Sequence, residues 1–117
     1  MAPLADPTLL TAYQNALRNH RFEGYVNWTE LAARWVRREL EGLTTSRAAE
    51  LMHDFVMSGG EIDQVRETRP EWRQHEYHYD LRLDIGGRRV YVETGLEFGD
   101  ATDPDDPVIL VANIHDV

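Results

Sequence analysis

Apolar residues recur at helical spacing over the first half of the chain. Leu10, Tyr13 and Leu17 follow the pair Asp6-Pro7, in which the aspartate suits a helix N-cap and the proline suits the first helical position. This pattern predicts a first helix that fades over residues 21–24.

Two further helices are predicted before residue 60. Asn27 with Glu30 three residues later resembles a capping box, so a second helix should begin there and end at Gly42. A third helix should begin near Thr45 and stop at the Ser-Gly-Gly of residues 58–60. The expected core positions of these two helices are Leu31, Trp35, Val36, Leu40, Ala48, Leu51, Met52, Phe55 and Val56.

The periodicity then changes from helical to alternating. Glu76–Phe98 reads EYHYDLRLDIGGRRVYVETGLEF, which predicts a hairpin that turns at Gly86-Gly87. The continuous apolar run over 108–114 predicts a strand buried on both faces. Residues 61–69 fit either a helix or a strand ending before Pro70, and we favour the strand.

The predicted fold is therefore α+β, with three N-terminal helices packed on one face of a three- to four-stranded antiparallel meander. At 117 residues the chain has the length of one domain, with a helical half over about 5–57 and a sheet half over about 61–115.

A two-residue loop also fixes which side chains of the hairpin face each other. Ile85 should pair with Arg88, and counting back from the turn places Leu81 opposite Val92 on the apolar face. On the opposite face the same register pairs two carboxylates directly. The expected facing pairs there are Asp84–Arg89, Arg82–Tyr91, Asp80–Glu93, His78–Gly95 and Glu76–Glu97.

Facing carboxylates destabilise a sheet unless something offsets their repulsion, and three explanations are open. Arg82, or an arginine of the flanking segment such as Arg66, Arg69 or Arg73, could neutralise them. His78, Asp80 and Glu93 could instead be weak candidates for a metal site, since imidazole and carboxylates suit zinc, manganese or iron. Alternatively, one carboxylate could keep a raised pKa and perform acid–base chemistry with His78.

Composition excludes several chemistries. The chain has no cysteine, which removes disulfides and thiol nucleophiles, and no lysine, which removes Schiff-base and P-loop lysines. No apolar run has the length of a membrane span, no cofactor motif is present, and a cytoplasmic location is expected. The net charge of −9 lies mostly in residues 61–117, which disfavours binding to nucleic acid and favours a basic partner.

These observations favour a small acidic binding or regulatory domain without catalysis that engages a basic protein, for example as the inhibitor of a basic toxin or nuclease. The expected partner-binding residues are Glu76, Asp80, Glu93, Glu97, Asp100, Asp103, Asp105 and Asp106. The sequence gives no indication of the oligomeric state.

Two enzymatic alternatives remain open. Helices followed by an antiparallel meander are similar in layout to small toxin ribonucleases of the RelE type, and that resemblance implies metal-independent RNA cleavage and a toxin–antitoxin role. The other alternative is a small metal-dependent or acid–base enzyme that uses the same sheet face. The candidate catalytic residues are His78, Asp80, Arg82, Tyr91 and Glu93.

Overall fold

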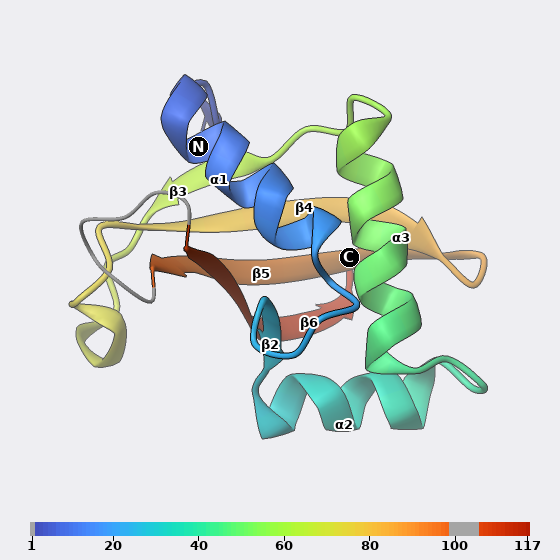
Figure 1. The fold of residues 1–117 in the computed structure, drawn as a ribbon. Coiled ribbons are helices and arrows are strands. Elements are labelled where there is room, and N and C mark those ends of the chain that lie inside the picture. The colour runs from blue at the N-terminus through green and yellow to red at the C-terminus, as the bar shows by residue number, and fades with distance from the viewer. Residues whose placement is uncertain (1, 99–105) are drawn as a thin grey trace.

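The computed structural model describes residues 2–98 and 106–117 (Figure 1). These residues form three α-helices, one short 3-10 helix and six strands. In chain order they are β1 (Ala2–Pro3), α1 (Pro7–Arg18), β2 (Val26–Trp28), α2 (Glu30–Glu39), α3 (Thr45–Met57), β3 (Asp63–Arg66), the 3-10 helix η1 (Pro70–Trp72), β4 (Tyr77–Ile85), β5 (Arg88–Phe98) and β6 (Pro107–Asp116).

The described strands form one sheet in the order β1-β3-β4-β5-β6-β2. All neighbours are antiparallel except β2, which runs parallel to β6 with Val26 opposite Ile109. The chain combines helices with a sheet, as an α+β fold should. The predicted arrangement is wrong, however, because β1 and β2 interleave with the helices and the six-stranded mixed sheet is not a short antiparallel meander.

Strand β2 was not predicted from the sequence. The sequence predicts Asn27 as the cap of a helix, but Asn27 lies within this strand, opposite Leu110 of β6. The actual N-cap of α2 is Thr29, whose Oγ1 accepts a hydrogen bond from the Ala32 amide at 3.2 Å and donates one to the Ala112 carbonyl at 3.0 Å. Thr29 therefore caps the helix and also links its N-terminus to β6 through the Ala112 carbonyl.

The other two helices begin as the sequence predicts. Asp6 Oδ1 accepts hydrogen bonds from the amides of Thr8 and Leu9, and Pro7 occupies the first position of α1. Helix α3 starts at Thr45 with Thr44 as its cap. Of the ambiguous residues 61–69, Asp63–Arg66 are a strand, as we favoured.

The hairpin register is confirmed from Tyr79–Thr94 to Ile85–Arg88, with Asp80 directly opposite Glu93. Gly86 and Gly87 have φ of 59° and 78°, and both central residues of a type I′ turn need such positive values. Recorded pairing between β4 and β5 stops at Tyr79–Thr94, so the predicted facing pairs Glu76–Glu97 and His78–Gly95 do not belong to the ladder.

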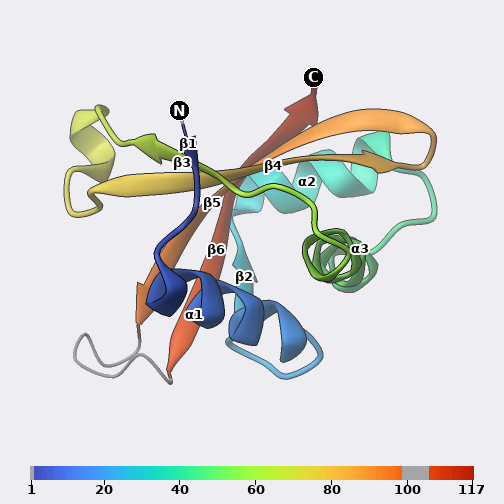
Figure 2. The same cartoon turned by 90° about the horizontal axis from the view of Figure 1, so that it is seen from above.

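The three helices bury one face of the sheet. Tyr13 and Leu17 of α1, Val36 of α2 and Met52 of α3 share a core with Leu81 of β4 and its neighbours. Figure 2 shows α1 and α3 on the same side of the sheet. Leu31 does not belong to this core, because 63% of it is exposed.

Strand β6 alternates rather than being buried on both faces. Its fully buried residues Ile109, Val111 and Ile114 point toward the helices, whereas Leu110 and Ala112 are half-buried. The register of β5 against β6 shifts between Glu93 and Thr94, which is a bulge. Bulges redirect side chains, and this one lies beside the paired carboxylates.

Candidate functional site

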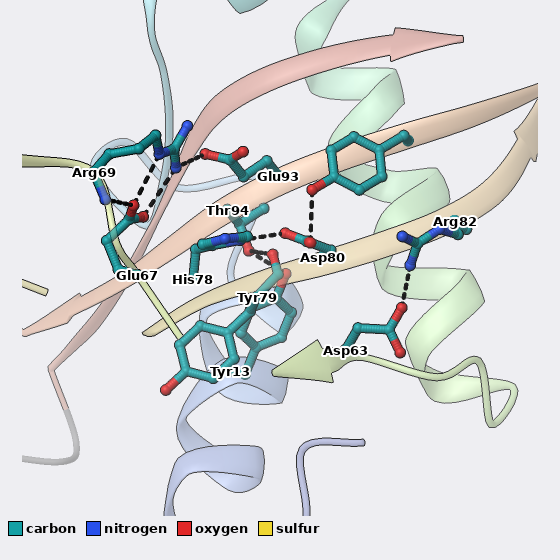
Figure 3. Close-up of polar contacts among 11 residues, drawn as sticks. Tyr13, Asp63, Glu67, Arg69, His78, Tyr79, Asp80, Arg82, Glu93 and Thr94 are labelled. Atoms are coloured by element: carbon teal, nitrogen blue, oxygen red, sulfur yellow. Dashed lines mark hydrogen bonds and ion pairs between the residues drawn. The ribbon is translucent and has the colours of Figure 1, made fainter. Parts of the chain in front are cut away.

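The face of the sheet opposite the helices, called the outer face from here on, carries a dense group of charged side chains (Figure 3). We call this group the outer-face cluster. It contains four carboxylates, two guanidinium groups, one imidazole and one phenol. Its members are Asp63, Glu67, Arg69, His78, Asp80, Arg82, Tyr91 and Glu93.

Asp80 is 2% exposed and Glu93 is 7% exposed, so the two facing carboxylates are screened little by solvent. Burying an ionised carboxylate is costly unless its oxygens are paired. Asp80 is paired with side chains of β4 and β5, and Glu93 is paired with a side chain from the connection between β3 and η1.

Asp80 is held by neutral or weakly basic donors from the sheet. Its Oδ1 lies 2.8 Å from His78 Nδ1, and its Oδ2 accepts a hydrogen bond from the Tyr91 hydroxyl at 2.6 Å. Burial raises the pKa of Tyr91, and the hydrogen bond to the Asp80 carboxylate raises it further, so the phenol keeps its proton.

Glu93 is held by Arg69, which lies between β3 and η1. Arg69 Nη2 lies 2.5 Å from Glu93 Oε2. The same guanidinium makes a two-point contact with Glu67, at 2.8 Å from Nε and 2.9 Å from Nη2. Figure 3 shows Arg69 between the two acids, above the sheet. Bidentate pairs of this kind are strong and directional.

The contact between Arg69 and Glu67 shifts the pKa of both groups. The hydrogen bonds from Arg69 lower the pKa of Glu67 to about 2, against the opposing effect of burial. Glu67 and Glu93 in turn raise the pKa of Arg69. Arg69 and its two acidic partners therefore form a triad in which one guanidinium contacts both carboxylates.

Arg82, another arginine named for the carboxylates, pairs with Asp63 of β3, and its guanidinium carbon lies 5.1 Å from the centre of the Tyr91 ring. His115 stacks on Tyr91 with ring centres 4.8 Å apart. Tyr91 is therefore fixed by its neighbours as well as by Asp80.

The first of the three explanations is thus the one that the geometry matches, with Arg69 as the neutralising arginine. No group of three or more histidine or acidic side chains within residues 2–98 and 106–117 is arranged to hold a metal. His78, Asp80 and Glu93 do not converge, because Asp80 turns to His78 and Tyr91 while Glu93 turns to Arg69.

A small cavity lies beside the cluster, where β4 and β5 part. Its volume is about 10 Å³, room for about one water molecule. Trp72 of η1, His78 and Gly95 are among its walls, and a β-carbon built on Gly95 would meet only open space.

The remaining predicted partner-binding residues are divided. Glu76 and Glu97 have side chains 66% and 43% exposed, with Arg66 at 3.7 Å from the first and His75 at 3.4 Å from the second. Asp106 is half-buried, directly before β6. Asp100, Asp103 and Asp105 lie outside the described residues.

Sequence reasoning missed Glu67 and Asp63 as members of the cluster. The available signal was the sequence Glu67-Thr68-Arg69-Pro70, in which an acid and a base two residues apart precede a proline. Asp63 became visible only through the pairing of β3 with β4, which places it opposite Asp80.

Comparison with known proteins gives no relative: no family model, no curated protein and no solved structure matches this chain. Within the described residues no helix is both long and apolar enough to cross a membrane. The candidate function therefore rests on the geometry alone.

Proposed function

We propose that the chain is a non-catalytic binding domain that engages a basic protein through exposed carboxylates at one end of the sheet. We call this surface the acidic end and define it by the exposed side chains of Glu76 and Glu97 and the half-buried Asp106. The observation that supports it is that the acids of β4 and β5 differ in burial and in pairing. Asp80 and Glu93 are buried and paired internally, whereas Glu76 and Glu97 expose much of their side chains.

The acidic end brings together three chain segments that are distant in sequence. Strand β4 begins, β5 ends and β6 begins there, as Figure 1 shows on its left side. The sequence adds Asp100, Asp103 and Asp105 to the segment that joins β5 to β6. Clustered exposed charge of one sign steers a partner of opposite charge over about 8–10 Å in physiological salt.

This surface replaces the broader acidic sheet face that the sequence suggested. A partner arginine could reach Asp80 or Glu93 only by displacing His78, Tyr91 or Arg69 from contacts of 2.8 Å or less. Removing one member of a buried, charged network is strongly unfavourable. The exposed acids carry no such cost.

The test compares two triple variants of equal charge. Glu76→Gln/Glu97→Gln/Asp106→Asn neutralises the acidic end, and Glu23→Gln/Glu30→Gln/Glu41→Gln neutralises three exposed acids elsewhere. Binding of an arginine-rich peptide is followed by fluorescence anisotropy at about 0.15 M salt. We expect about tenfold weaker binding for the first variant and less than about twofold for the second. Equal losses, or no binding by the parent, would contradict the proposal.

One observation favours a second candidate, acid–base catalysis at His78. Asp80 accepts the hydrogen bond from His78 Nδ1, so the other ring nitrogen, Nε2, is the one left to take a proton. His78 also lines the cavity that has room for one water. This arrangement could activate that water for hydrolysis.

The two candidates separate in a turnover assay. RNA and simple esters serve as substrates, with His78→Gln compared against His75→Gln, a histidine that also lines the cavity. Catalysis at His78 requires turnover by the parent that His78→Gln abolishes and His75→Gln retains. The resemblance to toxin ribonucleases was based on helices followed by an antiparallel meander. The structure does not have that arrangement, because its helices and strands interleave.

A further inference from the structure

Helix α1 ends against α3 at a pair of histidines. His20 follows the last turn of α1, and its ring centre lies 5.9 Å from that of His53 in α3, with the two ring planes tilted by 42°. Figure 1 and Figure 2 both show the C-terminal end of α1 beside α3. Neither histidine belongs to the outer-face cluster or to the acidic end, so this junction is separate from the candidate site.

The two rings differ in the groups that they meet. His53 Nδ1 lies 3.3 Å from Oδ1 of Asp54, and such a carboxylate suits a protonated ring. His20 Nδ1, in contrast, is buried and has no hydrogen-bond partner among the described residues. Buried polar atoms in folded proteins nearly always have a partner, so this nitrogen needs a physical explanation.

The charge of the His20 ring decides how much this unpaired nitrogen costs. In the neutral ring the proton can lie on Nε2, and Nδ1 is then only an acceptor without a donor. In the charged ring both nitrogens carry protons, so Nδ1 becomes the buried donor of a cation without an acceptor, which costs much more. The folded chain therefore accommodates a neutral His20 and opposes its protonation.

The charged and titratable groups that face His20 act mostly in the same direction. Burial lowers the pKa of His20, and His53 of α3 and the neighbouring Arg21 lower it further, whereas Asp54 of α3 opposes them. Asp54 already contacts His53, and its side chain is 59% exposed, so water screens its attraction for His20. The junction therefore holds a ring that resists taking up a proton.

The connection that begins at His20 leads to the edge strand β2. The Phe22 amide donates to the Asn19 carbonyl at 2.9 Å, and the Ile109 amide of β6 donates to the Tyr25 carbonyl at 2.8 Å, directly before β2. Residues 19–25 contain no fully buried side chain, and Phe22 is 64% exposed. A segment without a core side chain of its own can open while the core stays folded.

We propose that the His20–His53 pair is a pH-sensitive contact, which holds residues 19–25 against α3 above about pH 7 and releases them as His20 takes up a proton below about pH 6. The closed state favours the neutral ring and the open state accepts the proton, so the closed state binds fewer protons. Its stability relative to the open state therefore falls as the pH drops below about 6.5, the pKa of a free imidazole.

Amide hydrogen exchange followed by NMR tests this proposal, with protection factors that correct for the intrinsic effect of pH on exchange. The parent is compared with His20→Phe, which keeps a ring but takes up no proton. Between pH 7.5 and pH 5.5, the protection of the Phe22 amide should fall by about threefold to tenfold in the parent, since one proton changes the opening equilibrium by at most about tenfold over this range. In the variant it should fall by less than about 1.5-fold.

The amide of Val92, on the central strand β5, reports opening of the core. Its protection should exceed that of Phe22 at least about tenfold at both pH values, because local opening costs less free energy than global unfolding. Equal protection of the two amides would show that the connection opens only with the whole fold, and this result would overturn the proposal.

Two further variants complete the test. His20→Gln is a second neutral replacement, used in place of His20→Phe if urea melts show that the phenylalanine variant is not folded. His115→Gln removes an exposed histidine elsewhere and should keep the pH dependence of the parent at Phe22. A pH dependence that persists in the folded His20 variant, or that disappears in His115→Gln, would assign the effect to another group and overturn the proposal.

Discussion

Tyr91 and Asp80 join β5 to β4 through a hydrogen bond of 2.6 Å from the phenol hydroxyl to Oδ2. The two residues are not directly opposite, since Tyr91 faces Arg82 and Asp80 faces Glu93. The phenol therefore reaches diagonally across the sheet to a carboxylate whose side chain is 3% exposed. This bond and the contact with His78 offset the free-energy cost of burying the Asp80 carboxylate.

Replacement of Tyr91 by Phe should lower the free energy of unfolding at pH 7 by about 1.5–3 kcal/mol, because a hydrogen bond to a buried charge is lost. Urea unfolding of parent and variant measures the change. Tyr25→Phe is the control, since the Tyr25 hydroxyl has no hydrogen bond to any described residue. A loss below about 0.5 kcal/mol would contradict the importance given to this bond.

Glu93→Gln decides between crowding and pairing of the facing carboxylates. If the two acids merely repelled each other, the variant would be as stable as the parent or more so at pH 7. The 2.5 Å contact with Arg69 leads us to expect the opposite, a loss of about 1 kcal/mol. The estimate is modest because the Arg69 side chain is 37% exposed and keeps Glu67.

Urea melts at pH 7 provide the measurement. Glu97→Gln is a matched control, because that carboxylate is 43% exposed and should change the free energy of unfolding by less than about 0.5 kcal/mol. A gain in stability for Glu93→Gln would contradict this expectation. It would indicate that the parent keeps the repulsion between Asp80 and Glu93 at a cost in stability, as functional sites do.

Glu67 should make the fold sensitive to acid. Its pKa falls from 4.5 to about 2 on folding, because Arg69 stabilises the ionised form. A lowered carboxyl pKa contributes stability that is complete above pH 4.5 and is lost as the pH falls toward 2. We expect about 2 kcal/mol from this source, after a discount for the partly exposed Arg69.

The measurement compares parent and Glu67→Gln in urea from pH 7 down to pH 3. The difference in the free energy of unfolding should be constant above pH 5 and should shrink below it. A difference that does not change with pH would mean that the Glu67 carboxylate is not tied to Arg69 by charge.

The features that the sequence predicted correctly are those that depend on residues close together in the chain. The Asp6-Pro7 helix start and the Gly86-Gly87 turn are local signals, and the hairpin register follows from the turn together with the alternation on both sides. The same reasoning led from the register to the Asp80–Glu93 pair without any structure.

The errors concern partners that are distant in sequence. Val26–Trp28 is a strand only because β6 lies beside it, more than eighty residues later, and three residues carry too little periodicity to reveal this. Arg69 is one of four arginines that the sequence offers to the carboxylates, and only the path of the β3–β4 connection selects it. Asp63 escaped notice because the extent of β3 was not known.

Tyr13 and Thr94 couple helix α1 to the sheet through a buried relay, and a double-mutant cycle should show it. The Tyr13 hydroxyl lies 2.8 Å from Thr94 Oγ1, which donates to the Tyr79 carbonyl at 2.6 Å, so Tyr13 is the donor to Thr94. Both residues are 0% exposed.

Thr94→Val keeps the shape but leaves the Tyr13 hydroxyl without its partner and removes the side-chain hydrogen bond to the Tyr79 carbonyl, which should cost about 2–3 kcal/mol. Tyr13→Phe removes only the first donor, and Thr94 still serves Tyr79, so its cost should be about 1 kcal/mol. In the double variant the stranded hydroxyl is gone. Its loss in free energy of unfolding should therefore fall short of the sum of the single losses by at least about 0.5 kcal/mol, whereas strict additivity would mean that the two hydroxyls act independently.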